Sequence, residues 1–181
     1  MTCLSLDCCE TFHWNYVSQH CTLLTTDVWS STQTVTEISH WKSYYKGCDS
    51  GWLEFNYHCY KLVHGKISWA DAKLTCERNC AYLTEITDVE ENDWIVEAFL
   101  DDACSTRSCQ MWCGGNDIET EDLFQWSNSK LTMSFTNWKP GQPRQKYSEK
   151  AENRDCVTLS RNGQWENILC TLSKRFICEK H

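Results

Sequence analysis

The stretch Trp112-Cys113-Gly114-Gly115-Asn116-Asp117 marks a change in the pattern of the sequence. Before it, apolar residues recur at helical spacing. After it, short aromatic and β-branched segments are separated by Gly, Asn, Pro and Ser, a pattern typical of strands joined by loops. Helices followed by antiparallel strands predict an α+β fold.

The helical half contains two predicted amphipathic helices. The first opens at Ser68 with Asp71 three residues on, and the second opens at Thr87 with Glu90 at the reciprocal position. A short strand at residues 59–63 precedes both helices. The side chains predicted to face the core are Trp69, Ala72 and Cys76 in the first helix, and Trp94, Ile95, Ala98 and Phe99 in the second.

The strand half contains one clear turn signal, Asn162-Gly163. Asn-Gly tolerates the positive φ angles of a type I′ turn, so a hairpin with a two-residue loop is predicted here. We expect Trp165, just beyond the turn, to be largely buried.

Composition excludes several classes of function. The net charge of −8 over 181 residues disfavours general attraction to nucleic acid or to anionic membranes. No apolar run approaches the ~20 residues of a membrane span, so membrane insertion is not expected. The sequence lacks GxSxG, HExxH and Walker motifs, so the chain is not expected to be an enzyme.

The cysteines predict an oxidising environment. The chain has 14 of them, scattered along its length rather than in CxxC pairs. This usage favours a secreted, extracellular, disulfide-braced protein. Residues 1–46 differ in character from the rest and are predicted to form a separate N-terminal segment, whose run from Cys9 to Leu23 faintly resembles part of a PAN/apple module. Residues 47–181 are predicted to form the main domain.

Landmarks along this main domain resemble, in order, those of the C-type lectin-like domains in their long form. The resemblance covers about three quarters of the chain and implies the C-type lectin-like fold, with two helices, antiparallel sheets and long loops. It also implies the disulfides Cys48–Cys59, Cys76–Cys178 and Cys156–Cys170. The landmarks are Trp69-Ala70-Asp71-Ala72, Cys76, Leu83, Ile86, Glu90-Glu91, the stretch from Trp112 to Asp117, Phe124-Gln125-Trp126, residues 136–143, Cys156, Trp165, Cys170 and Phe176-Ile177-Cys178-Glu179.

The other eight cysteines have no pairing implied by the resemblance. They are Cys3, Cys8, Cys9 and Cys21 in the N-terminal segment, and Cys80, Cys104, Cys109 and Cys113 in the domain. Cys113 stands at an apolar strand position of the family and is expected to be buried. We expect it to pair with one of the other three in the domain, in one of three possible connectivities.

The family's sugar site normally holds Ca²⁺, which takes six to eight oxygen ligands. This chain departs from that pattern at Gln142-Pro143-Arg144 and at Asn153-Arg154-Asp155-Cys156, where arginines replace two liganding residues. Guanidinium groups have no acceptor for a cation, so no calcium is expected at this site. A loop about four residues longer than usual keeps Ca²⁺ possible through Glu149 or Glu152.

The resemblance implies a carbohydrate site at these positions, and with the two arginine replacements we expect five residues to bind the sugar: Gln142, Arg144, Arg154, Glu166 and Asn167. We expect Arg144 and Arg154 to lie close together on an exposed face, with Glu166 paired to one of them. Guanidinium groups match carboxylate and sulfate, so anionic glycans are the favoured ligands and a glycan or glycoprotein the expected partner. The alternative is a calcium-independent module that binds another extracellular protein or has a structural role.

Overall fold

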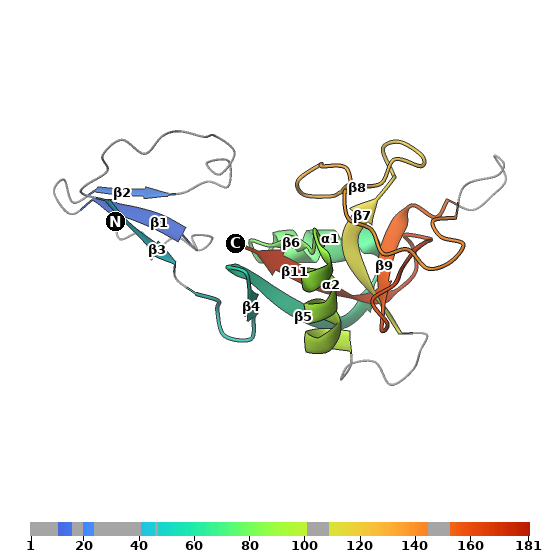
Figure 1. Cartoon of the computed structure of the whole chain (residues 1–181), viewed down its shortest axis with the longest axis horizontal. Coiled ribbons are helices and arrows are strands. Elements are labelled where there is room, and N and C mark those ends of the chain that lie inside the picture. Colours follow the sequence, from blue (N-terminus) through green and yellow to red (C-terminus); the bar gives the residue numbers. More distant parts are fainter. Residues whose placement is uncertain (1–10, 16–19, 24–40, 46, 101–108, 145–152) are drawn as a thin grey trace. The chain divides into compact units, whose positions relative to one another are not determined.

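The computed structural model describes residues 11–15, 20–23, 41–45, 47–100, 109–144 and 153–181. The chain divides into two compact units, one of residues 1–59 with His181, and one of residues 60–180. In the first unit, three antiparallel strands form a sheet in the order β2-β1-β3 (Figure 1). These strands are β1 (Thr11–Asn15), β2 (His20–Leu23) and β3 (Trp41–Tyr45), and β4 (Leu53–Phe55) follows them. The predicted domain boundary after residue 46 stays a prediction.

The first predicted helix is confirmed as α1 (Trp69–Glu77). Ser68 is its N-cap, and the Ser68 side chain accepts a hydrogen bond from the Asp71 backbone N–H at 3.2 Å. Trp69, Ala72 and Cys76 are its buried residues, as their spacing predicts.

The second helix, α2 (Val89–Ile95), begins one residue later than predicted and continues into a π-helical turn, η3 (Val96–Leu100). The cap is Asp88 rather than Thr87, because the Asp88 carboxylate accepts from the Glu91 backbone N–H at 2.8 Å. The Glu91 carboxylate in turn accepts from the Thr87 backbone N–H at 2.8 Å. The helix therefore begins at an acidic cap, because carboxylates are strong acceptors for the free N–H groups at a helix N-terminus.

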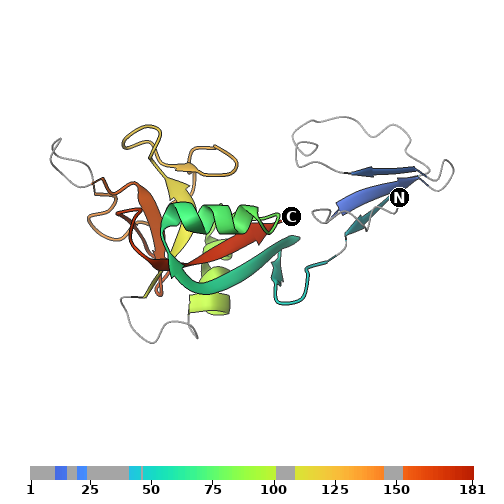
Figure 2. The same ribbon diagram turned by 180° about the vertical axis from the view of Figure 1, so that it is seen from behind.

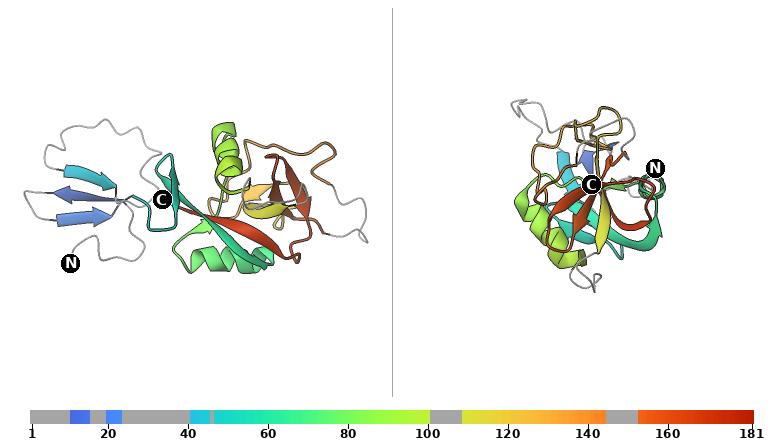
Figure 3. Two further views of the ribbon diagram at one scale, coloured as in Figure 1. Left: turned by 90° about the horizontal axis from the view of Figure 1, so that it is seen from below. Right: turned by 90° about the vertical axis from the view of Figure 1, so that its right-hand side faces the viewer.

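The strands of the domain form one eight-stranded sheet with the path β10-β9-β7-β11-β5-β4, in which β6 also pairs with β11 and β8 with β7. Strands β7 and β11 are parallel, whereas β9 is antiparallel to both β7 and β10. The two helices lie on opposite sides of β5 and β11 (Figures 1 and 2), and the view from below shows these strands passing between them (Figure 3). The bounds are β5 (His58–Ile67), β6 (Tyr82–Leu83), β7 (Gln110–Asn116), β8 (Gln125–Trp126), β9 (Cys156–Ser160), β10 (Trp165–Ile168) and β11 (Lys174–Lys180). Among the described residues, no helix is long and apolar enough to cross a membrane.

Aromatic side chains fill the core beneath the loops of the strand half. Trp165 is fully buried, as predicted. Its ring makes edge-to-face contacts with three others at centroid distances of 5.5 to 6.0 Å. These partners are Trp126, Phe135 and Trp138. Such pairs add about 0.5–1.5 kcal/mol each beyond the area that they bury.

The predicted hairpin forms, but its turn is not the two-residue type I′ turn. The Gly163 N–H donates to Ser160 O, and the Ser160 N–H donates to Gln164 O, so the loop has three residues. Gly163 alone of the Asn-Gly pair has a positive φ, of 77°. A type I turn followed by a left-handed residue is the usual three-residue hairpin loop, and here the glycine occupies the left-handed position.

Three disulfides join the pairs that the resemblance implies: Cys48–Cys59, Cys76–Cys178 and Cys156–Cys170. Cys80 and Cys109 are also disulfide-bonded, and Cys3, Cys8, Cys9 and Cys104 lie outside the described residues.

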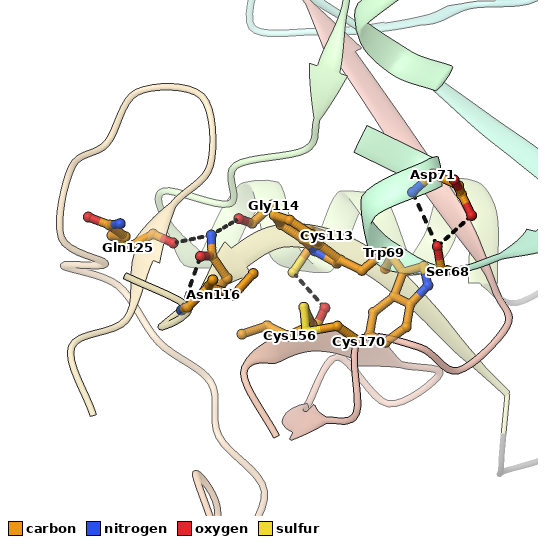
Figure 4. The surroundings of a disulfide bond; sticks show 12 residues. Ser68, Trp69, Asp71, Cys113, Gly114, Asn116, Gln125, Cys156 and Cys170 are labelled. Carbon is orange, nitrogen blue, oxygen red and sulfur yellow. Dashed lines mark hydrogen bonds between the residues drawn. A yellow bond between two sulfur atoms is a disulfide. The ribbon is translucent and has the colours of Figure 1, made fainter. Parts of the chain in front are cut away.

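The expectation that Cys113 is paired is wrong, because it is a free thiol. As predicted, it is buried. It lies in the middle of β7 near Cys156 and Cys170, which are already bonded to each other (Figure 4). Its Sγ donates to Val157 O at 3.5 Å, and its carbonyl accepts from Trp69 Nε1 at 2.8 Å. The core therefore uses this cysteine as a small apolar residue.

Candidate functional site

The loop that leads from β8 to β9 is fastened to β10 by backbone hydrogen bonds. The Trp165 N–H donates to Asn137 O at 2.8 Å, and the Lys139 N–H donates to Trp165 O at 2.9 Å. The Asn137 side chain donates to Gly163 O at 2.9 Å. Residues 137–139 therefore lie beside the first residue of β10, with one parallel bridge between Trp138 and Trp165 that holds the start of the loop in place.

The loop is fastened to β10 again at Arg144. The side-chain oxygen of Asn167 accepts from the Arg144 backbone N–H at 2.7 Å, while the Asn167 amide donates to Arg144 O at 2.9 Å. Asn167 is almost fully buried, whereas Arg144 is exposed. This pair of bonds fixes the backbone and leaves the Arg144 guanidinium at the surface.

Gln142 lies between these two attachments. Its backbone N–H donates to Lys139 O at 2.9 Å, and the bond to Pro143 is cis. Its side-chain oxygen is buried and has no hydrogen-bond partner. Arg144 and Asn167 are in contact through the two bonds above, and Gln142 lies two residues before Arg144. That these residues form a sugar site stays a prediction.

Glu166 is paired with a lysine and not, as expected, with an arginine. Lys139 Nζ lies 2.9 Å from Glu166 Oε1, and the two side chains are 31% and 17% exposed. The lysine is well placed because its own backbone is bonded to Trp165, the residue before Glu166. Arg154 is half-buried two residues before Cys156, and its closeness to Arg144 stays a prediction.

These five residues do not fit a calcium ion. Two of them are arginines, the Glu166 carboxylate is neutralised by Lys139, and both polar atoms of the Asn167 side chain bond to the Arg144 backbone. The Gln142 side-chain oxygen remains, but Ca²⁺ requires six to eight oxygen ligands.

A second group of acidic residues was not singled out from the sequence. Asp117, Glu121 and Asp122 bring carboxylate oxygens within 4.8 Å of one another. Asp117 is 4% exposed, its Oδ1 has no hydrogen-bond partner, and its Oδ2 accepts from the Asp122 N–H at 3.0 Å. Burial raises the pKa of Asp117 to about 6, with further contributions from Asp155 and Glu121. This donor set suits a hard divalent cation, and the spacing Asp117-x₃-Glu121-Asp122 was the available signal.

Comparison with known proteins agrees with the fold and with these landmarks. The family model of the lectin C-type domain matches residues 65–180. A perlucin-like protein of Mytilus galloprovincialis is 31% identical over 138 residues, which is 72% of this chain and 81% of the relative. The human C-type mannose receptor 2 is 30% identical over 152 residues, which is 83% of this chain but only 10% of that receptor.

Solved structures give the same result. The carbohydrate-recognition domain of the mouse scavenger receptor C-type lectin is 33% identical, with a TM-score of 0.67 over 75% of this chain and 98% of that one. Three findings indicate the same family. They are a family model that covers most of the chain, a relative that is matched over most of its length, and a shared fold. The chain belongs to the C-type lectin domain family.

Proposed function

We propose that this chain is a secreted, extracellular carbohydrate-binding protein that does not use Ca²⁺ at the site formed by Gln142, Arg144, Arg154, Glu166 and Asn167. The observation that carries the proposal is the closure of the Arg144 backbone onto Asn167. This closure uses oxygen that a cation would need and directs a guanidinium outward. The solved carbohydrate-recognition domain at 33% identity supports the choice of ligand class.

Anionic glycans are the favoured ligands within that class. Residues 139–161 contain six Lys and Arg against three Asp and Glu, in a chain whose net charge is −8. Each charge-assisted hydrogen bond from a guanidinium to a sulfate or carboxylate contributes about 1.5–3 kcal/mol. A neutral sugar hydroxyl also accepts a hydrogen bond from a guanidinium, but it adds no attraction between opposite charges.

Binding of immobilised acidic and neutral glycans, measured with and without EDTA, tests the proposal. We expect acidic glycans to bind equally well in EDTA. We expect Arg144→Ala to weaken their binding at low salt without lowering the melting temperature, and the double variant Arg144→Ala/Arg154→Ala to weaken it at least tenfold. Arg78→Ala, which removes an exposed arginine at the end of α1, is the matched control and should bind as the parent does. Loss of all binding in EDTA would contradict the proposal.

A calcium-independent protein-binding role is the second candidate. Three large apolar residues on the segment between β7 and the Lys139 loop are about half exposed or more: Ile118, Leu123 and Leu131. Exposed apolar residues of this kind can form the centre of a protein interface. Under this alternative, Leu131→Ser would reduce the capture of a protein from extracellular fluid, while no glycan would bind.

Among the described residues, a divalent cation would be held by Asp117, Glu121 and Asp122, whose carboxylate oxygens lie within 4.8 Å of one another. Asp117→Asn removes the buried carboxylate and should abolish binding of Tb³⁺, used as a luminescent calcium substitute, without altering binding of acidic glycans.

A further inference from the structure

Three neighbouring strands bring polar side chains to the same level of the sheet. The parallel register pairs Arg175 with Met111, so Lys174 and Gln110, one residue earlier in each strand, are also neighbours. Lys174 Nζ donates to Gln110 Oε1 at 2.5 Å. Gln110 is paired in turn with Ser160 of β9. An amine, an amide and a hydroxyl therefore stand side by side on β11, β7 and β9.

The polar side chains continue toward β10. Alternate residues of a strand share a face, so Ser160 lies on the same face as Thr158, which is paired with Glu166. Glu166 holds Lys139 at 2.9 Å, in an ion pair that remains partly open to solvent. On the other side, β11 is next to β5, which carries the exposed Lys66 near its end. We call Lys66, Gln110, Lys139, Ser160, Glu166 and Lys174 the lysine row.

Positive charge exceeds negative charge in the lysine row. It contains three amines and one carboxylate, and Lys139 already pairs with that carboxylate. Burial lowers the pKa of Lys174, the negative charge of Glu166 opposes this change, and repulsion from Lys66 and Lys139 adds to the lowering. An anion bound beside Lys174 would offset the repulsion from the other two lysines and raise the pKa of Lys174.

The row also contains an unused hydrogen-bonding group. The Ser160 hydroxyl is buried, with the residue 2% exposed, and it has no hydrogen-bond partner. An unsatisfied buried polar group costs about 1–3 kcal/mol, which a ligand oxygen within reach would recover.

We propose that the lysine row is a second carbohydrate subsite, which binds a sulfate or carboxylate group of an anionic glycan. This inference rests on the proposed function: the row shares Glu166 with the site at Arg144 and adds Lys66, Gln110, Lys139, Ser160 and Lys174. The amines would hold the anionic group, while Gln110 and the Ser160 hydroxyl bond to its oxygens or to neighbouring sugar hydroxyls. A row with both charged and neutral hydrogen-bonding groups suits a sugar better than an acidic peptide, which offers mostly charge.

Isothermal titration of the full chain with a heparin-derived tetrasaccharide tests the proposal. We expect Lys66→Gln/Lys174→Gln to weaken binding at least tenfold, and Arg78→Gln, which removes one positive charge at the far end of α1, to change it less than twofold. Desulfated and carboxyl-reduced forms of the tetrasaccharide show which anionic group the row prefers. A hexaglutamate peptide serves as the acidic-peptide probe and is expected to bind at least tenfold more weakly.

A second measurement guards against misfolded variants. In the parent protein, the NMR titration of the Lys174 side chain should give a higher pKa after the tetrasaccharide is added, because the ligand offsets the repulsion from Lys66 and Lys139. This shift requires no substitution.

The outcomes separate this inference from the proposed function. If Arg144→Ala/Arg154→Ala abolishes binding while the lysine variant binds as the parent does, the row is not a subsite and the proposed function stands. If hexaglutamate binds as tightly as the tetrasaccharide and its binding depends on Lys66 and Lys174, the row is a peptide-binding surface and the inference is overturned. If no glycan binds at all, both are overturned.

Discussion

Cys113 illustrates a residue whose surroundings decide its chemistry. Burial raises the pKa of its thiol to about 12. The thiolate is the reactive form, so almost none of it exists at neutral pH. The neighbouring Cys156–Cys170 disulfide is therefore protected from exchange with this thiol.

Iodoacetamide labelling tests this protection. At pH 8 we expect no alkylation of Cys113 in the folded protein and complete alkylation in guanidinium chloride, measured by peptide mass spectrometry. Cys113→Ala should cost only about 1 kcal/mol of unfolding free energy, because it removes one small buried sulfur atom. Rapid labelling of the folded chain would show that the thiol is reachable.

The same residues show what the sequence can predict at this scale. The burial of Cys113 followed from its place in an apolar strand, but its unpaired state did not, because pairing depends on which cysteines come within bonding distance in space. Similarly, Arg144 was correctly placed beside Asn167. The pairing of Glu166 with Lys139 was missed because it depends on the backbone bond between Lys139 and Trp165.

Among the elements, the β9–β10 hairpin is held by its contact with α2. Asn92 Oδ1 accepts from Trp165 Nε1 at 2.9 Å, and a Cβ added at Gly163 would lie 2.8 Å from Asn92 Nδ2. Asn-Gly predicted the hairpin from local chemistry. The length of the loop could not be predicted, because it also depends on how the tip packs against a helix distant in sequence.

Gly163→Ala should therefore be strongly destabilising. The added methyl group meets both a positive φ of 77° and the Asn92 amide, for a combined cost of about 2–3 kcal/mol. Gly65→Ala is the matched control, because Gly65 has ordinary φ and open space around it. Urea unfolding of both variants measures the difference, and equal stabilities would contradict the packing described for the hairpin tip.

The start of α2 predicts a pH dependence of stability. Glu91 accepts from Tyr60 Oη at 2.7 Å and from the Thr87 N–H, and burial followed by the charge of Glu179 raises its pKa to about 6. The folded state then binds the proton more tightly than the unfolded state, in which the pKa is about 4.5. The stabilisation is complete below pH 4.5 and is lost as the pH rises to about 6, with a slope of at most about 1.4 kcal/mol per pH unit.

Urea unfolding at a series of pH values between 4 and 7 measures this slope. In Glu91→Gln the slope should be smaller, whatever the absolute stability of the variant. The burial of Glu85 also raises its pKa, so part of the slope should remain. A slope unchanged by the substitution would assign the effect to other groups.

At the scale of the whole molecule, covalent bridges connect elements that lie far apart in sequence. Cys76–Cys178 ties α1 to β11 across 102 residues, and Cys156–Cys170 joins β9 to the segment before β11 across 14. These pairings could be predicted because the order of landmarks identifies the family fold. The positions of the basic side chains could not, since no family landmark specifies Lys66, Lys139 or Lys174.

The bridges predict that a reductant will destabilise the domain and that a chelator will not. In the chain-entropy account, closing loops of these lengths stabilises the fold by roughly 4–5 and 3 kcal/mol, together comparable with the 5–15 kcal/mol that stabilises a typical domain. Cys76, Cys156 and Cys178 are almost fully buried, so reduction requires partial opening and long incubation. After such incubation with TCEP, we expect the melting transition measured by circular dichroism to fall by tens of degrees or to disappear.

EDTA should leave the melting transition unchanged, because the residues at the Arg144 site do not fit a cation. If EDTA alone lowers the melting temperature by several degrees, a structural cation is present, and Asp117→Asn shows whether it is bound at Asp117, Glu121 and Asp122. In that variant the effect of EDTA would vanish.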